Sequence, residues 1–230
     1  MRIVMELTLG GWIMLNIKII DYGIGNLLSV IRAFEYLDVR AELAKVPEEL
    51  KYADAIILPG VGAFEKGMQG LVNSGFYETI IEYAKKGLPI MGICLGMQML
   101  MDESYEFGVH KGLGLIPGKV VPIQSTTIDG EQHKIPHIGW NELILPEQKV
   151  EEWDKTILSG LTQRNSVYFI HSYTAMPIES RYRLADTLYG GRRLSAVIRN
   201  GNIYGCQFHP EKSGQVGIDI LSNFINIAKK

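Results

Sequence analysis

The sequence has few of the features that mark secreted, membrane-bound or nucleic-acid-binding proteins. Only two of its 230 residues are cysteines, Cys94 and Cys206, which is too few for a disulfide framework and suits a reducing cytoplasm. It has no unbroken apolar run of about 20 residues, the length needed to span a membrane. The net charge is −2, with no long run of either sign to attract nucleic acid or an acidic membrane. We therefore expect a cytoplasmic protein that binds neither nucleic acid nor membrane.

Apolar residues make up 47% of the chain, enough for one substantial core. Residues 1–13 are also largely apolar, but Glu6 and the pair Gly10 and Gly11 interrupt them. They lack the basic start and the small-residue cleavage site of a signal peptide. We expect residues 1–13 to be an N-terminal extension of unknown role, and residues 14–230 to form a single domain.

Strand and helix signals alternate in the first half of the chain. A helix is expected after Asn26, which would cap it, because apolar residues recur there at helical spacing. A helical region is expected up to residue 86, and residues 95–101 are expected to begin another helix. Strands are expected at 17–20, 39–43, 55–58 and 89–93. Repeated β-α units of this kind predict a parallel sheet with helices on both faces.

The second half has a more antiparallel pattern. Extended segments joined by turns are expected at 112–123, 135–145, 167–175 and 194–208. Asn200 and Gly201 suit a hairpin turn, because both tolerate positive φ. A closing helix is expected from about residue 217. The predicted fold class is α/β, with a mostly parallel sheet, helices on both faces and an antiparallel β segment in the second half.

One cysteine stands where a strand is expected to turn into a helix. Cys94 lies in G-I-C-L-G, residues 92–96, the pattern of a nucleophile elbow, in which glycines let backbone segments crowd around a strained nucleophile. The unpaired N–H groups at a helix start stabilise a thiolate. The N–H of Leu95 would point to the place where an oxyanion forms. The motif alone also fits a core cysteine between two packing glycines.

The best candidate for a general base is His209, which stands in Q-F-H-P-E. In an extended segment Glu211 would lie on the same side as His209. The carboxylate could then hold one ring nitrogen while the other faces the thiol. Cys206, His209 and Glu211 could instead bind a metal, but no second Cys/His pair completes a tetrahedral set. We therefore expect no metal and no cofactor.

A glycine-rich turn, P-G-V-G at residues 59–62, follows the third expected strand. The carboxyl ends of parallel strands share one edge of a sheet, where ligands bind. We expect the N–H of Val61 to be a second oxyanion donor, after a peptide flip that Gly60 and Gly62 make easy. A simple strand-ending turn is the alternative.

The motif G-I-C-L-G-M-Q with a distant H-P-E resembles the class I, triad-type glutamine amidotransferases. From residue 14 onward the chain is similar to one branch of them, the glutaminase subunits of imidazole glycerol phosphate synthases in histidine biosynthesis. The matching motifs are D-Y-G-I-G-N (21–26), L-P-G-V-G-A-F (58–64), G-I-C-L-G-M-Q (92–98), G-L-G-L-I-P-G (112–118), P-H-I-G-W-N (136–141), Y-F-I-H-S-Y (168–173) and Q-F-H-P-E-K-S (207–213).

The resemblance implies a flavodoxin-like fold and a catalytic triad of Cys94, His209 and Glu211. Such a triad hydrolyses glutamine to glutamate and ammonia through a cysteine thioester. The residues that match contacts to the glutamine are Gly62, Gln98, His171, Ser172 and Tyr173. For Gln98 the alternative is an exposed helix residue, and for residues 171–173 an ordinary strand.

The resemblance also implies a heterodimer. Ammonia would pass to a cyclase subunit of (β/α)8-barrel fold, which makes imidazole glycerol phosphate and an aminoimidazole carboxamide ribonucleotide. Asn26, Trp140, Tyr168 and Lys212 match residues at that interface; core packing is the alternative for Trp140 and Tyr168. In this family glutaminase activity stays low until the partner binds its nucleotide, and a peptide flip near Val61 is a hypothesis for the switch.

Three features depart from the family pattern: residues 1–13, the polar insertion at 124–133, and Ile24. They leave room for a paralogue that supplies ammonia for amidino-sugar synthesis in surface polysaccharide. A hydrolase or redox sensor with the same elbow is a further alternative, although such relatives usually have a histidine where Leu95 stands. A non-catalytic binding subunit is the last alternative, and the intact triad residues argue against it.

Overall fold

The computed structural model describes residues 15–147 and 153–229. Its centre is a seven-stranded sheet in which β1 to β4 and β13 run parallel, while β12 and β11 extend one end antiparallel. The order across the sheet is β11 (Arg183–Tyr189), β12 (Arg192–Asn200), β13 (Ile203–Cys206), β4 (Ile90–Cys94), β3 (Ala55–Gly60), β1 (Ile17–Ile20) and β2 (Ala41–Ala44). The mostly parallel α/β fold expected from the sequence is confirmed.

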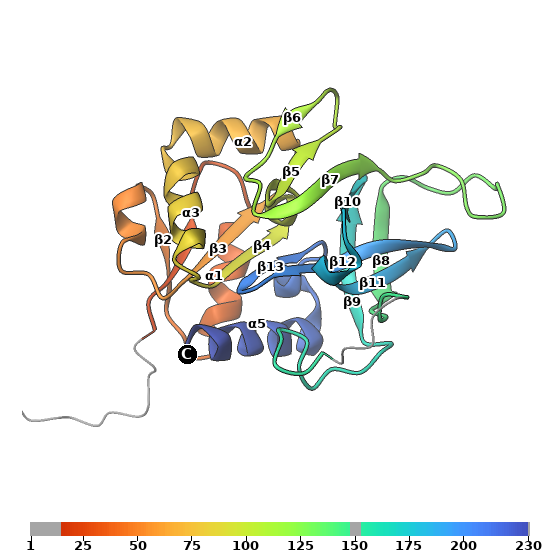
Figure 1. The fold of residues 1–230 in the computed structure, drawn as a ribbon. Coiled ribbons are helices and arrows are strands. Elements are labelled where there is room, and N and C mark those ends of the chain that lie inside the picture. Colours follow the sequence, from red (N-terminus) through yellow and green to blue (C-terminus); the bar gives the residue numbers. More distant parts are fainter. Residues whose placement is uncertain (1–14, 148–152, 230) are drawn as a thin grey trace, which may run out of the picture.

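Helices cover both faces of this sheet (Figure 1). α1 (Leu27–Glu35) and α5 (Gly214–Ala228) pack on one face, and their apolar sides share one buried cluster. α2 (Phe64–Asn73) and α3 (Phe76–Lys85) pack on the other face in a second cluster. Strands β3 and β4 are buried along their whole length. That burial explains why both read as continuous apolar runs.

Smaller β layers lie beyond the carboxyl ends of β3 and β4 (Figure 1). One is a four-stranded sheet in the order β10 (Tyr173–Pro177), β7 (Ile116–Pro122), β5 (Met101–Ser104) and β6 (His110–Lys111). The other pairs β8 (His137–Glu142) with β9 (Ser166–His171). Short 3₁₀ turns complete the description: η1 (Pro47–Leu50), η2 (Ser180–Tyr182) and η3 (Pro210–Lys212).

Several expected elements differ in detail. The helical region up to residue 86 is two helices, because the left-handed Gly75 (φ 77°) separates α2 from α3. The helix that begins after the cysteine, α4 (Leu95–Met99), is only five residues long, and β5 begins after one further residue. The expected strand at 167–175 is split at Ser172 into β9 and β10. Asn26 precedes α1, but its side chain makes no capping hydrogen bond.

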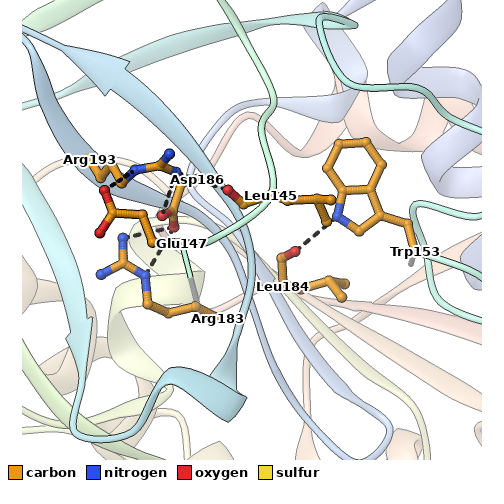
Figure 2. Close-up of polar contacts among 7 residues, drawn as sticks. All are labelled: Leu145, Glu147, Trp153, Arg183, Leu184, Asp186 and Arg193. Atoms are coloured by element: carbon orange, nitrogen blue, oxygen red, sulfur yellow. Dashed lines mark hydrogen bonds and ion pairs between the residues drawn. The ribbon is translucent and has the colours of Figure 1, made fainter. Parts of the chain in front are cut away.

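At the antiparallel end of the large sheet, the buried carboxylate of Asp186 binds two arginines (Figure 2). The side chain of Asp186 is 1% exposed, and Arg183 donates to its Oδ1 from Nε (3.0 Å) and Nη2 (2.7 Å). Arg193 Nη1 lies 3.6 Å from Oδ2 and donates to the carbonyl of Leu145, while Arg193 Nε donates to Glu147. Burial raises the pKa of Asp186, and the two arginines oppose that shift. The cluster ties the segment after β8 to β11 and β12.

In the part of the chain that the structure describes, no helix has the length and apolar character needed to cross a bilayer. The predicted extension, residues 1–13, lies outside the described residues.

Candidate active site

The corner between β4 and α4 holds Cys94 in a conformation that side chains rarely adopt, with φ 55° and ψ −108°. Both neighbouring glycines are required by packing. A Cβ at Gly96 would overlap the carbonyl oxygen of Leu58, and one at Gly92 would lie 2.6 Å from the carbonyl oxygen of Gly96. The close approach of strand and helix therefore explains the G-x-C-x-G spacing.

His209 and Glu211 form a buried pair. His209 Nδ1 lies 2.8 Å from Glu211 Oε1, and the two side chains are 4% and 2% exposed. The expectation of an extended segment is wrong, because Glu211 lies in the 3₁₀ turn Pro210–Lys212. Pro210 fixes φ near the helical value and so favours the turn. The turn, rather than strand alternation, brings the carboxylate onto the ring.

The environment of His209 favours its protonated form. Burial alone would lower its pKa, because burial disfavours a cation. The sulfur of Cys94 and the carboxylate of Glu211 outweigh this effect and raise the pKa of His209 to about 9. His209 is therefore an imidazolium at neutral pH, next to a sulfur atom that can carry a negative charge.

Backbone contacts fix the position of His209. Its N–H donates to the carbonyl of Tyr168 at 3.1 Å. Ser213 Oγ donates to the carbonyl of His209 (2.7 Å) and accepts from the N–H of Tyr168 (3.0 Å). Ser213 thus joins β9 to the histidine segment. Sequence reasoning did not single out Ser213, because a serine in a turn carries no distinctive pattern.

A pocket of about 270 Å³ opens at this corner, at the carboxyl edge of the sheet. It collects all the predicted catalytic, oxyanion and substrate-binding residues except Glu211, which lies behind His209. The lining residues are Val61, Gly62, Cys94, Leu95, Gln98, Glu106, Pro136, Ile170, His171, Ser172, Tyr173 and His209.

Gln98 is 6% exposed, so the alternative of an exposed helix residue is wrong. Its Nε2 donates to the carbonyl of Tyr173 at 3.1 Å and to Gln207 Oε1 at 3.2 Å. Both side-chain N–H bonds are therefore used within the protein. The side-chain oxygen of Gln98 is left as the polar atom that can meet a ligand in the pocket.

His171 supports the pocket wall in an uncharged form. Its Nδ1 lies 2.8 Å from the carbonyl of Tyr173, and its Nε2 lies 3.0 Å from Nδ1 of His137. Burial is the main reason that the pKa of His171 falls to about 3, and burial also lowers the pKa of His137. These contacts hold the break between β9 and β10, where Ser172 faces the pocket.

Sequence reasoning missed Glu106, which supplies a carboxylate to the pocket. Its Oε2 accepts the N–H of Phe64, the first residue of α2, and its own N–H donates to Ser104 Oγ. The residue lies in an irregular turn after β5 and belongs to no motif. Only the fold brings it to the site, so no periodicity or spacing could have identified it.

The predicted interface residues lie on neighbouring elements. Trp140 and Tyr168 face each other across β8 and β9, with ring centroids 6.0 Å apart. Trp140 is 55% exposed, so the alternative of core packing is wrong for it, while Tyr168 is half-buried. Lys212 is exposed in η3, and η3 contacts α1, which begins after Asn26.

Across residues 15–147 and 153–229, no three His, Cys, Asp or Glu side chains are grouped so that they could hold a metal ion. Both cysteines are free. Cys206 is fully buried, and burial together with the charge of Glu211 raises the pKa of its thiol. It is therefore a poor metal ligand and a poor nucleophile.

A cysteine elbow, a His-Glu pair and a flavodoxin-like sheet are the features of triad-type amidotransferases. Residues 18–227 match the family "Glutamine amidotransferase class-I", and the chain belongs to this family. Among similar curated proteins, "Imidazole glycerol phosphate synthase subunit HisH 1" of Legionella pneumophila (strain Lens) is 55% identical, over 93% of this chain and 100% of that protein. The HisH subunit of Geobacillus sp. (strain WCH70) is 44% identical, over 92% and 96%.

Solved structures agree on the fold. A chain described as a glutamine amidotransferase superposes with a TM-score of 0.70 at 18% identity, covering 93% of this chain and 99% of its own. PurLQS from Thermotoga maritima gives a TM-score of 0.68 at 20% identity, covering 93% and 98%. At these identities the likeness shows the fold alone.

Proposed function

We propose that this chain is the glutaminase subunit of an imidazole glycerol phosphate synthase. It hydrolyses glutamine and passes the ammonia to a cyclase subunit of (β/α)8-barrel fold in the cytoplasm. The observation that carries the proposal is the meeting of Cys94, His209 and Gln98 at one pocket, with Glu211 behind the histidine. The names of relatives that are 55% and 44% identical support the histidine-pathway branch over the amidino-sugar paralogue. We assign residues 14–230 to one amidotransferase domain.

The chemistry follows from the charges at the corner. The Cys94 thiolate attacks the carboxamide carbon of glutamine, and a carbon–sulfur bond forms. The His209 imidazolium gives its proton to the leaving nitrogen, the carbon–nitrogen bond breaks, and ammonia departs. His209 then takes a proton from water, whose oxygen adds to the thioester carbon. The carbon–sulfur bond breaks, the new carboxyl group gives its proton to solvent as glutamate leaves, and the Cys94 thiolate and His209 imidazolium are restored. Glu211 keeps the ring oriented through Nδ1.

The negative oxygen of each tetrahedral intermediate needs donors. Leu95 begins α4, so its N–H is unpaired within the helix and available at the corner. Val61 lies across the same pocket, between Gly60 and the left-handed Gly62 (φ 93°). We assign the second donor to Val61 N–H after a flip of its peptide, which would couple turnover to the partner subunit.

The pocket offers complementary groups for an amino acid. Glu106 provides a carboxylate for the α-ammonium group of glutamine. The backbone of Gly62, Ser172 and Tyr173 offers hydrogen bonds to its α-carboxylate. The oxygen of Gln98 accepts from the N–H₂ of the carboxamide, because both N–H bonds of Gln98 are used elsewhere. His171 acts by holding the wall that carries these contacts.

The proposal is tested by assaying glutamine-dependent synthesis with a histidine-pathway cyclase and its nucleotide substrate. Wild type should make imidazole glycerol phosphate from glutamine. Cys94→Ala should reduce the glutamine-dependent rate at least about a thousandfold, since it removes the nucleophile, while free ammonium salts should still support synthesis. If Cys94→Ala kept glutamine turnover, the mechanism would be wrong. If wild type hydrolysed glutamine but yielded no imidazole glycerol phosphate with such cyclases, the pathway assignment would be wrong.

A further inference from the structure

The residue directly after β13, Gln207, is fully buried beside the nucleophile but does not line the pocket. β13 runs parallel to β4 with Cys206 opposite Ile93, so the next position on each strand places Gln207 beside Cys94. Gln207 Nε2 lies 3.9 Å from Cys94 Sγ in donor geometry. The amide therefore reaches the sulfur from the protein interior, where no substrate contacts it.

The orientation of the Gln207 amide is set by an unambiguous acceptor. The carbonyl of Tyr173 can only accept, so the atom of Gln98 that lies 3.1 Å from it is the nitrogen. The same nitrogen lies 3.2 Å from the Gln207 side chain, which must present its oxygen there. The nitrogen of Gln207 therefore faces the sulfur. One backbone carbonyl thus fixes the direction of every hydrogen bond from Tyr173 to Cys94.

A second group near the sulfur has the opposite preference. Cys94 Sγ lies 3.8 Å from the carbonyl of Ile170, which can accept only from the S–H of a thiol. The N–H of Gln207 can donate to sulfur in either state, and such a bond is stronger when the acceptor is charged. Gln207 therefore favours the thiolate, whereas the Ile170 carbonyl favours the thiol.

We propose that Gln207 stabilises the Cys94 thiolate and fixes the orientation of Gln98, so that one buried amide prepares both the nucleophile and a substrate contact. This inference rests on the proposed role of Cys94 as the nucleophile. Gln207 would thus assist the triad by donating to the Cys94 sulfur from the protein interior, while the substrate approaches the sulfur from the pocket.

The pH profile of Cys94 alkylation by iodoacetamide tests the inference, because the thiolate and not the thiol reacts. Cys206 is 0% exposed, and peptide mass analysis separates its signal from that of Cys94. Gln207→Met keeps the shape of the side chain but removes donor and acceptor. The midpoint of the profile should move upward by about one pH unit, the size of one hydrogen bond to a charged group, and the rate well below the midpoint should fall about tenfold. A profile unchanged within about 0.3 unit overturns the inference.

Ser195→Ala is the matched control. Ser195 is a buried polar residue on β12, and its hydroxyl has no hydrogen-bond partner among the described residues. Its profile should match wild type. A shift of the same size in Ser195→Ala would mean that any buried change disturbs the corner, and would overturn the assignment to Gln207.

A measurement on the unaltered side chain covers the case in which Gln207→Met does not fold. In ¹⁵N-labelled protein, the Gln207 Nε2 signals should shift with pH at the midpoint of Cys94 alkylation. The shift should disappear in Cys94→Ala. If the Gln207 signals in wild type did not shift with pH at that midpoint, the inference would be overturned. The proposed function fails separately, when Cys94→Ala still hydrolyses glutamine.

Discussion

Three buried histidines near the pocket respond to pH in opposite directions. His171 has a folded-state pKa of about 3, below its unfolded value, and the pKa of His137 is lowered as well. The unfolded chain therefore binds more protons below pH 6.5, and stability falls as the pH decreases through that value. His209 has a raised pKa of about 9. Its contribution is fully present below pH 6.5 and is lost as the pH rises through 9.

These signs predict an acid-sensitive fold whose sensitivity depends on His171. Between pH 7 and pH 5, wild type should lose about 2 kcal/mol of unfolding free energy through this residue. His171→Asn, which retains a donor near the Nδ1 position, should lose correspondingly less over that range. Urea unfolding at pH 7 and pH 5 measures the difference. His110→Asn, on β6 and outside the pocket, should behave as wild type; equal losses in all three proteins would contradict the prediction.

At the scale of elements, local motifs predicted the corner well and the antiparallel end poorly. The β4–α4 corner follows from the G-x-C-x-G spacing, because packing against Leu58 admits no side chain at Gly96. Strand β11 was not expected. It carries Asp186 at a buried position, and the arginines that neutralise the carboxylate become its neighbours only after folding. Glu106 and Gln207 were missed for the same reason, since their roles depend on contacts between distant segments.

Arg193 contacts two carboxylates, the buried Asp186 and the exposed Glu147, so their contributions to stability can be compared. Asp186→Ala should destabilise the fold by about 3 kcal/mol, because it leaves the partly buried Arg183 without its partner. Glu147→Ala removes a side chain that is 74% exposed and should change stability by less than about 0.5 kcal/mol. Denaturant unfolding at pH 7 compares the two. Similar small effects would show that the buried pair contributes little.

At the scale of the whole molecule, the residues proposed to face a partner were predicted only through family resemblance. No pattern in the chain distinguishes an interface tryptophan from a core tryptophan. In the structure Trp140 is 55% exposed and so is not packed in the core, whereas Trp153 is 6% exposed. The ladder from Trp140 and Tyr168 to the backbone of His209 also gives the surface a direct link to the site. A partner bound at Trp140 would therefore lie beside β9, a strand that is hydrogen-bonded to His209.

Trp140→Ala should weaken binding of the cyclase subunit by about thirtyfold, since exposed aromatic anchors often contribute about 2 kcal/mol or more. Tyr52→Ala is the matched control. Tyr52 is 76% exposed, but it precedes β3 and so lies at the amino edge of the sheet, opposite the pocket. Calorimetric titration with the purified cyclase measures both affinities. If Trp140→Ala bound as tightly as Tyr52→Ala, the proposed interface would be wrong.

The backbone angle at Cys94 links heat resistance to loss of activity. Glycine adopts φ 55° and ψ −108° without steric cost, whereas any side chain there stores about 1 kcal/mol or more of strain. A laboratory selection for thermal stability alone would therefore favour glycine at position 94 and remove the proposed nucleophile. A selection for higher thermal stability should therefore screen for turnover in every round. Alternatively, position 94 can be excluded from the library and stabilising changes sought in distant loops.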